Sequence, residues 1–121
     1  MPTIHHPDLR EVPVSTVLAA LSDETRLNIV LQLKDGERCC GDMDVRASKS
    51  GLSHHMKVLR QAGIIRQRPN GTQRLTSLRT AEVEHRFPGL LTAVLRAASP
   101  DDDDESDQAM SSPALSFASA S

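Results

Sequence analysis

The spacing of apolar positions predicts two amphipathic helices in the first third of the chain. The first helix begins at about Pro13, which suits a helical first turn, and its apolar residues recur at three- and four-residue steps. The second helix is expected to have Ser22 as its N-cap and to end before Gly36. The stripe of the first helix consists of Val14, Val17, Leu18 and Leu21.

A third helix is predicted after a segment of weak periodicity, residues 37–46, which allows only a short helix. Its N-cap is Ser48 or Ser50, and Gly63 stops it. We therefore expect a helix over about Ser50 to Ala62 that buries one face and exposes the other. The buried positions are Leu52, Met56, Leu59 and Ala62.

The chain then changes to a pattern typical of a β-hairpin. Residues 64–68 are suited to an extended strand, the Asn70–Gly71 pair signals a tight turn, and residues 73–78 return as the partner strand. Residues 80–98 are apolar at helical spacing again, and Pro88 is expected to divide them into two helices. The order of helices followed by a hairpin and a final helix is that of a winged helix-turn-helix, a mainly α fold with a small β-hairpin.

Charge divides the chain into unlike parts. Residues 1–98 carry all fourteen Lys and Arg against ten Asp and Glu, whereas residues 99–121 carry six acids and no base. The acidic, Ser-rich tail has no apolar period, so we expect residues 99–121 to be disordered. The expected organisation is a flexible N-terminal arm over residues 1–11, a DNA-binding and dimerisation domain over 12–98, and this tail.

Composition argues against several classes of protein. The only aromatic side chains are Phe87 and Phe117, so a stacking platform for single-stranded nucleic acid has no material. No apolar run approaches the ~20 residues that cross a bilayer, and the polar start is unlike a secretion leader, which favours a cytoplasmic protein without membrane contact. Sequence motifs of hydrolases and phosphate-binding enzymes are absent, so we expect no enzymatic activity.

The most informative charge pattern is local. Residues 45–79 contain eight Lys and Arg and no Asp or Glu. A basic segment of this kind is the expected footprint of double-stranded DNA, because neutralising phosphates releases counterions. These bases are Arg46, Lys49, Lys57, Arg60, Arg66, Arg68, Arg74 and Arg79.

The candidate DNA contacts are the side chains of the third helix and the hairpin that could extend into a groove of DNA or to its phosphates. Side chains on the first turns of the third helix would enter the major groove, and the hairpin would follow the adjacent minor groove or its phosphates. The alternative is a winged-helix module that binds proteins and no DNA, although such a module has no need to exclude acids from residues 45–79. The predicted contacts are Lys49, Ser50, Gly51, Ser53, His54, His55, Lys57 and Arg60 on the helix, and Arg66, Arg68, Asn70 and Arg74 on the hairpin.

Two segments resemble the ArsR/SmtB family of arsenic-repressor-like transcriptional regulators. Residues 21–27 are similar to the family's second-helix pattern Leu-x-Asp-x-x-Arg-Leu, and residues 50–65 are similar to its recognition helix and the exit into the wing. The resemblance implies a homodimeric repressor that binds an inverted-repeat operator, joined through its first and last helices. The implied interface residues are Val14, Val17, Leu18, Leu90, Leu91, Val94 and Leu95.

The resemblance also suggests where an inducer binds. The family's thiolate metal site surrounds a Glu-Leu-Cys-Val-Cys-Asp motif, and residues 37–42 stand at that position without the spacer between Cys39 and Cys40. Three alternatives stay open for these cysteines: a thiol-bound metal or metalloid, an oxidant, or no sensing role. Glu82, Glu84 and His85 do not reproduce the family's other metal site, on the last helix. No cofactor is expected to be required for DNA binding itself.

Overall fold

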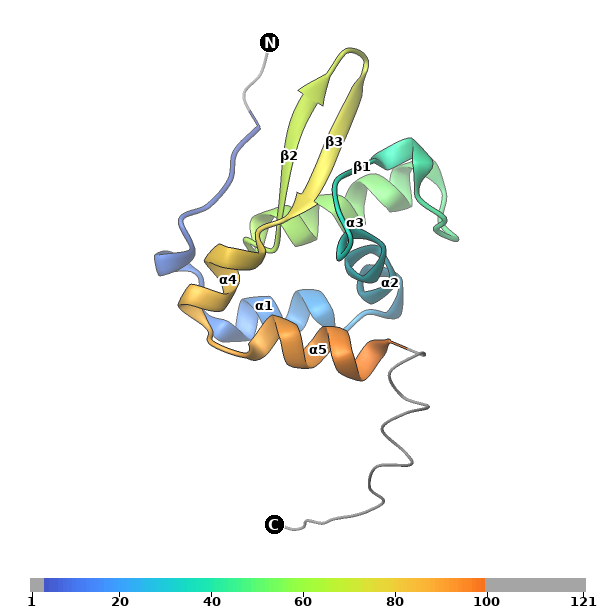
Figure 1. The fold of residues 1–121 in the computed structure, drawn as a ribbon. Coiled ribbons are helices and arrows are strands. Elements are labelled where there is room, and N and C mark those ends of the chain that lie inside the picture. Colours follow the sequence, from blue (N-terminus) through green and yellow to red (C-terminus); the bar gives the residue numbers. More distant parts are fainter. Residues whose placement is uncertain (1–3, 100–121) are drawn as a thin grey trace.

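The computed structural model describes residues 4–99, apart from the side chain of Cys40 (Figure 1). The fold over these residues is mainly helical with a small antiparallel sheet, as the sequence predicts. The sheet projects as a wing from one end, and α1 and α5 lie at the opposite end. In chain order the elements are η1 (Leu9–Glu11), α1 (Val14–Leu21), α2 (Glu24–Leu33), β1 (Arg38–Cys39), η2 (Cys40–Asp42), α3 (Lys49–Gln61), β2 (Ile65–Asn70), β3 (Gln73–Leu78), α4 (Thr80–Arg86) and α5 (Leu90–Ala98).

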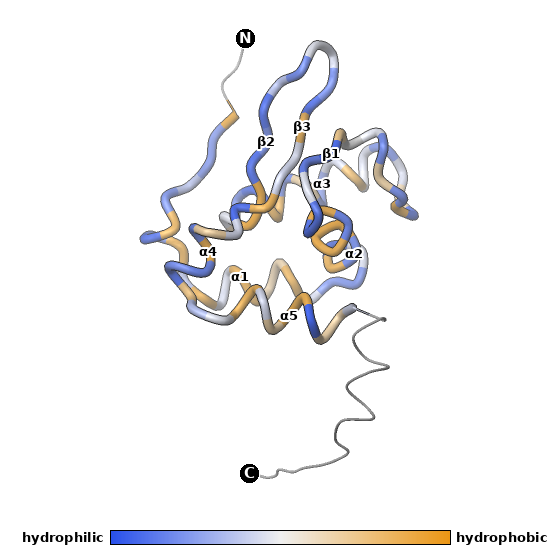
Figure 2. The backbone as a smooth tube through the Cα atoms, in the orientation of Figure 1, coloured by the Kyte–Doolittle hydropathy of each residue, from blue (hydrophilic) through white to orange (hydrophobic). Residues whose placement is uncertain are grey.

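The core lies where the helices meet the base of the wing. Figure 2 shows apolar segments along the helices and a largely polar hairpin tip. Val17 and Leu91, predicted at a dimer interface, are 0% and 1% exposed and belong to this core instead. Burying a side chain of this size contributes about 1.5–3 kcal/mol, so the core is the main source of stability. Its most deeply buried members include Val17, Ile29, Leu33, Leu59, Ile64, Ile65, Val83 and Leu91.

The junction of α1 and α2 is capped one residue later than predicted. Ser22 is the C-cap of α1, and its hydroxyl donates to the Ala19 carbonyl oxygen at 2.7 Å. Asp23 is the N-cap of α2, and its carboxylate accepts from the Arg26 backbone N–H at 3.0 Å. Both residue types are good N-caps, and the sequence alone does not distinguish them.

The sheet has three strands in the order β1-β3-β2, one more than predicted. The additional strand, β1, pairs with the middle of β3, at Leu75 and Thr76, and two residues are too few to show a period. The hairpin register pairs Asn70 with Gln73, so the two-residue turn is Gly71–Thr72. Gly71 has a φ of +64°, which the first central residue of a tight hairpin turn requires. The Asn70–Gly71 signal therefore identified the hairpin, and the turn itself lies one residue later.

Pro88 separates α4 from α5, as predicted, and Glu84 secures the junction. Its carboxylate accepts the Gly89 N–H at 2.9 Å and the Thr92 N–H at 3.0 Å. These backbone hydrogen bonds lower the pKa of Glu84, so the carboxylate is a charged cap for the start of α5. Glu84, which does not reproduce the family's metal site in the sequence, thus has a structural role.

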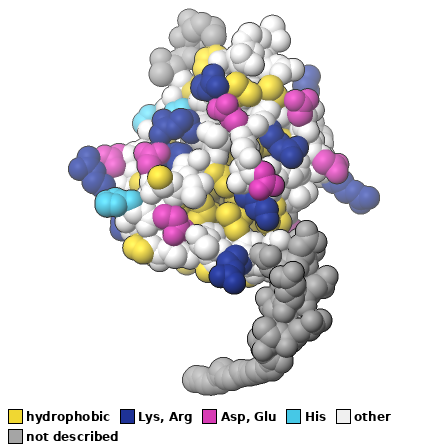
Figure 3. All heavy atoms as spheres, viewed as in Figure 1, with side chains coloured by type: hydrophobic (Ala, Val, Ile, Leu, Met, Phe, Trp, Pro, Cys, Tyr) yellow, Lys and Arg dark blue, Asp and Glu magenta, His cyan; other side chains and the backbone are white. Residues whose placement is uncertain are grey.

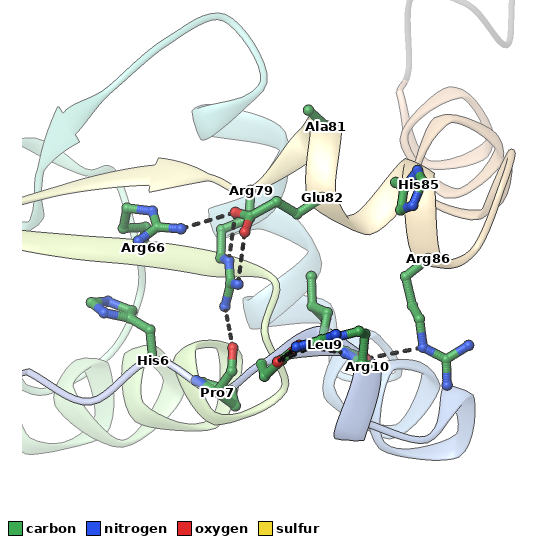
Figure 4. Close-up of a pocket in the computed structure, with 11 residues that line it drawn as sticks. His6, Pro7, Leu9, Arg10, Arg66, Arg79, Ala81, Glu82, His85 and Arg86 are labelled. Carbon is green, nitrogen blue, oxygen red and sulfur yellow. Dashed lines mark hydrogen bonds and ion pairs between the residues drawn. The ribbon is translucent and has the colours of Figure 1, made fainter.

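Residues 6–12, called the N-terminal segment below, pack against the domain. The sequence predicts a flexible arm over residues 1–11, of which residues 1–3 lie outside the described part of the chain. Leu9 and Val12 are each only 5% exposed. Leu9 lies directly on Gly63, where any Cβ would collide with the leucine side chain. Arg86 donates to the Leu9 carbonyl oxygen at 3.0 Å (Figure 4) and to the Val12 carbonyl oxygen at 3.3 Å. The segment escaped sequence analysis because two buried apolar residues do not make a recognisable period.

His6 fastens the same segment to the wing. Its Nε2 accepts a hydrogen bond from the Gln67 backbone N–H at 3.0 Å. Arg79 adds a second link by donating to the Pro7 carbonyl oxygen at 2.9 Å. Burial, followed by the charges of Arg66, Arg79 and Arg60 and then that of His5, lowers the pKa of His6 from its ordinary value of 6.5. The folded state therefore favours the neutral imidazole, which is the form that can accept this bond.

We expect acid to loosen this attachment. Because the pKa of His6 is lower in the folded state, its contribution to stability is complete above about pH 6.5 and is lost as the pH falls through the folded-state pKa. His6→Gln keeps an acceptor that does not titrate. The wild-type free energy of unfolding should therefore fall more than that of His6→Gln between about pH 7.5 and about pH 5.5.

The measurement is urea unfolding followed by circular dichroism at one fixed protein concentration, since the chain has no Trp or Tyr. His5→Gln, at the exposed neighbouring position, is the matched control and should follow the wild type. Equal pH dependence in wild type and His6→Gln would show that His6 does not hold the segment.

No helix in residues 4–99 is both long and apolar enough to span a bilayer. The predicted disordered tail lies, apart from Ser99, outside the described residues. Ser99 itself is 4% exposed at the end of α5.

Candidate nucleic-acid interface

The third helix begins at an exposed, capped N-terminus. Ser48 is the N-cap, and its hydroxyl accepts the Gly51 N–H at 3.0 Å. Lys49 and Ser50 are exposed in the first turn, and Gly51 is partly buried beneath the cap. The start of α3 therefore presents a cation and a hydroxyl to solvent beside backbone N–H groups that point out of the helix.

One face of α3 is polar and exposed along its whole length. Met56 and Leu59 are buried, at 3% and 0% exposed, and they turn the opposite face outward. Figure 1 shows α3 running across the base of the wing. We call the outward set the α3 stripe; it consists of Ser50, Ser53, His54, Lys57 and Gln61.

His55 does not belong to this stripe, contrary to the sequence prediction. Its Nδ1 lies 3.2 Å from Nη1 of Arg26, and its side chain is 19% exposed. Because a guanidinium only donates, Nδ1 of His55 accepts this bond. Adjacent helical positions diverge by about 100°, so His54 faces solvent while His55 faces α2. His55 is a structural link between α2 and α3.

Arg60 is also turned away from solvent, toward the wing. It donates to Oε1 of Gln67 at 2.8 Å, and Gln67 donates in turn to the Thr76 hydroxyl at 3.3 Å. Burial, followed by the nearby charge of Arg74, lowers the pKa of Arg60. Arg60 therefore connects α3 to both long strands of the wing, and its predicted role in binding DNA is replaced by a structural one.

Two of the predicted wing cations are already paired with acids. Arg68 donates to both carboxylate oxygens of Glu37, at 3.0 and 3.2 Å, and Arg66 donates to Glu82 at 2.9 Å. Both acids lie outside the segment that contains no acid in the sequence. The segment is thus not free of acids in space, and any contact of Arg66 or Arg68 with DNA must compete with these ion pairs.

Arg74 has a different environment on the other face of the wing. Side chains two residues apart on a strand share a face, so Arg74 lies on the face of Thr76, toward α3. Its influence on the pKa of Arg60 agrees with this position. Arg74 is exposed, and no carboxylate within residues 4–99 lies within ion-pairing distance. The same is true of Arg46, Lys49 and Lys57.

Comparison with known proteins agrees with this geometry. Residues 23–67 match the sequence model described as "Bacterial regulatory protein, arsR family". The chain is 31% identical over 83 residues to the transcriptional repressor SdpR of Bacillus subtilis, covering 67% of this chain and 92% of that protein. This chain belongs to the arsR family of bacterial regulatory proteins.

Two further comparisons extend the similarity. The chain is 39% identical over 67 residues to the arsenical resistance operon repressor of Staphylococcus xylosus, over 54% of this chain and 64% of that protein. The crystal structure of Rv0081 from Mycobacterium tuberculosis superposes with a TM-score of 0.56 at 26% identity, covering 81% of this chain and 98% of that one. The arsR family is one of transcriptional regulators with a helix-turn-helix, so the expectation of a non-enzymatic DNA-binding protein is confirmed.

The structure gives a physical reason for the family's second-helix pattern in this arsR-family chain. Asp23 caps α2, and Arg26, three residues later, donates its Nε to the Ala20 carbonyl oxygen at 2.7 Å. The same guanidinium reaches the Ala19 carbonyl oxygen at 3.4 Å and His55 at 3.2 Å. Arg26 thereby joins α1, α2 and α3. Sequence reasoning had recognised the pattern but not this role.

The predicted effector position is only partly described. Cys39 is partly buried on β1 opposite Leu75, which is itself opposite Arg68, so the three side chains share a face of the sheet. Within residues 4–99, no three His, Cys, Asp or Glu residues cluster in a way that could hold a metal ion. The described side chains alone therefore do not form a metal site, and an effector at Cys39 and Cys40 stays a prediction.

An apolar groove runs between α1, α2 and α5, away from the wing. Its volume is about 340 Å³, and Leu18 of α1 and Val94 of α5 are among the residues that line it. Val14 and Leu18 are 44% and 48% exposed, large fractions for apolar residues of this size. Figure 3 shows hydrophobic side chains reaching the surface in the lower half of the molecule. Leu90 and Leu95, from the predicted interface, are partly buried against the core.

Proposed function

We propose that this arsR-family protein is a sequence-specific repressor that binds an inverted-repeat operator as a homodimer. The observation that carries the proposal is the α3 stripe, which starts at an exposed helix N-terminus, together with the exposed Arg74 on the face of the wing toward α3. A helix with a polar outer face fits the major groove, where Ser53 and His54 can contact base edges. Lys49, Lys57 and Arg74 are suited to the flanking phosphates.

The relatives support the same role. The chain resembles proteins named as transcriptional repressors. One of them is SdpR, and the similarity covers 92% of the length of SdpR. Repression follows if a bound dimer excludes polymerase from a promoter. Asn70 next to the wing turn is exposed and can reach the backbone beside the groove.

A second copy of the chain is the occupant we propose for the groove between α1 and α5. The groove is apolar, it lies at the opposite end of the molecule from the wing, and it is continuous with the exposed Val14 and Leu18. Covering such a surface with the same surface of a partner gives a two-fold dimer. The two α3 stripes would then address the two half-sites of the operator.

We expect unpaired and paired wing cations to differ in DNA binding. Arg74→Gln should weaken binding to DNA upstream of the protein's own gene by about 3- to 10-fold, and lower the slope of log K against log salt by about 1. The charge-neutral double variant Glu37→Gln, Arg68→Gln should leave this slope unchanged, because it removes a closed ion pair. Gel-shift titrations at several salt concentrations measure both.

Arg96→Gln, at an exposed position on α5, is the control for net charge and should bind like the wild type. His54→Ala should alter sequence preference instead of salt dependence, because His54 faces outward for base contact. If Arg74→Gln had the same salt slope as the wild type and Arg96→Gln, the wing would not touch DNA as proposed.

The proposed dimer makes a separate prediction. Leu18→Glu places a charge in the apolar groove, so it should weaken self-association about tenfold or more. Sedimentation equilibrium should then give a mass near that of the 13.2 kDa chain, where the wild type gives twice that mass. Thr16→Glu is the matched control, since Thr16 is exposed on the other side of α1. A monomeric wild type, or equal behaviour of the two variants, would contradict the dimer.

We further propose that a thiol-reactive inducer, a metal or metalloid ion or an oxidant, acts at Cys39 and Cys40. The support is the position of Cys39, which lies on the same face of the sheet as Arg68. Arg68 forms its ion pair with Glu37 on this face. An adduct on the thiol would lie beside this ion pair and disturb the middle of the wing. The named function of the S. xylosus relative, in arsenical resistance, is consistent with such an inducer.

The test is operator binding by the reduced protein during titration with arsenite, cadmium or hydrogen peroxide. Each effective reagent should lower the affinity of the wild type and leave that of Cys39→Ser, Cys40→Ser unchanged. A double variant that responds like the wild type would remove the cysteines from the mechanism.

A further inference from the structure

A second, larger pocket lies between the N-terminal segment, the base of the wing and α4 (Figure 4). Its volume is about 570 Å³, within the range of about 300–1,000 Å³ that is typical of small-molecule sites. It lies on different elements from the groove between α1 and α5, and it does not include the α3 stripe. Neither the DNA interface nor the proposed dimer uses it.

Positive charge predominates in the lining of this pocket. Arg10, Arg66, Arg79 and Arg86 contribute four guanidinium groups, while Asp8 and Glu82 contribute two carboxylates. Glu82 alone serves two of the arginines, accepting from Arg79 at 2.9 and 3.1 Å and from Arg66 at 2.9 Å. These bonds, that of Arg79 first, lower the pKa of Glu82 to about 2. The site therefore stabilises negative charge and has an excess of cationic groups.

The arginines differ in how much hydrogen-bonding capacity is already used. Arg79 is buried, with its side chain 5% exposed, and it is bound to Glu82 and to the Pro7 carbonyl oxygen. Arg66 has its side chain 47% exposed, and within residues 4–99 the only hydrogen bond of its guanidinium is the single one to Glu82. Figure 4 shows Arg66 and Arg79 converging on Glu82, with His6 on the same side as Arg66. Arg66 is thus the group best placed to donate hydrogen bonds to a second carboxylate.

The remainder of the lining consists of two histidines, His6 and His85, and three apolar residues. Pro7 and Leu9 come from the N-terminal segment, and Ala81 comes from the first turn of α4. A cationic group beside an apolar wall matches a ligand with an anionic head and a short hydrocarbon body. An inorganic anion would leave the apolar wall uncovered.

We propose that this pocket binds a small organic carboxylate, with its head on Arg66 and its apolar body against Leu9 and Ala81. Such a ligand would bridge the wing, the N-terminal segment and α4. The site goes beyond the proposed DNA-binding function and does not depend on it, because binding is measured on the protein without DNA.

The test uses octanoate as the probe and two-dimensional NMR of the full-length, ¹⁵N-labelled protein. Octanoate should cause saturable shifts of the Gln67 and Glu82 amide signals at concentrations below about 10 mM. It should bind at least about tenfold more tightly than octanamide, which lacks the charge, and than acetate, which lacks the apolar body. Equal binding of octanoate and octanamide, or of octanoate and acetate, would overturn the proposal.

Two variants locate the site by independent means. Ala81→Trp fills the pocket from an exposed helical position, and Arg66→Gln removes the proposed partner of the carboxylate. Each should weaken octanoate binding at least about tenfold, while Ala47→Trp and Arg96→Gln, at exposed positions outside the pocket, should not. Arg66→Gln keeps the test decisive if the tryptophan variant does not fold. Octanoate shifts centred on Leu18 and Val94, or undiminished binding by Arg66→Gln, would refute the site.

Discussion

The Arg26 guanidinium is the interaction on which the arrangement of the DNA-binding helices depends. It donates to the carbonyl oxygens that end α1, it stands on the turn of α2 that Asp23 caps, and it reaches His55 on α3. A lysine at this position could not make the same three connections, because its ammonium group is a single point and not a planar fork. The outward orientation of His54 follows from the inward orientation of its neighbour.

Sequence patterns predicted the elements well where a period extended over several turns. The helices α1, α2 and α3, the hairpin and the break at Pro88 all emerged from apolar spacing and turn chemistry. Shorter features were missed because local sequence does not determine them. The strand β1 has two residues and forms only because β3 offers an edge, and the N-terminal segment is held by Leu9, His6 and Pro7 through partners distant in sequence.

In the candidate site, too, features that follow from a helical period were predictable, and features that depend on residues distant in sequence were not. Exposure of Lys57 and His54 follows from helical period, so these positions were predictable. The environments of Arg66 and Arg68 were not, because Glu82 and Glu37 approach them from outside the basic segment. A run without acids in the sequence describes the composition of a segment, whereas the electrostatic potential depends on every charge within a Debye length. Arg74 stands apart because it lies on the other face of the strand pair.

The contact between Leu9 and Gly63 has an evolutionary consequence. Gly63 joins the end of α3 to the wing with a φ of +81°, and the leucine occupies the space of its missing side chain. Any side chain at 63 would strain this backbone and would also collide with Leu9, so the N-terminal segment can keep its place only with glycine there. Glycine at this position is therefore expected in relatives that keep the segment packed on the domain, and its loss would identify the relatives in which the segment is released.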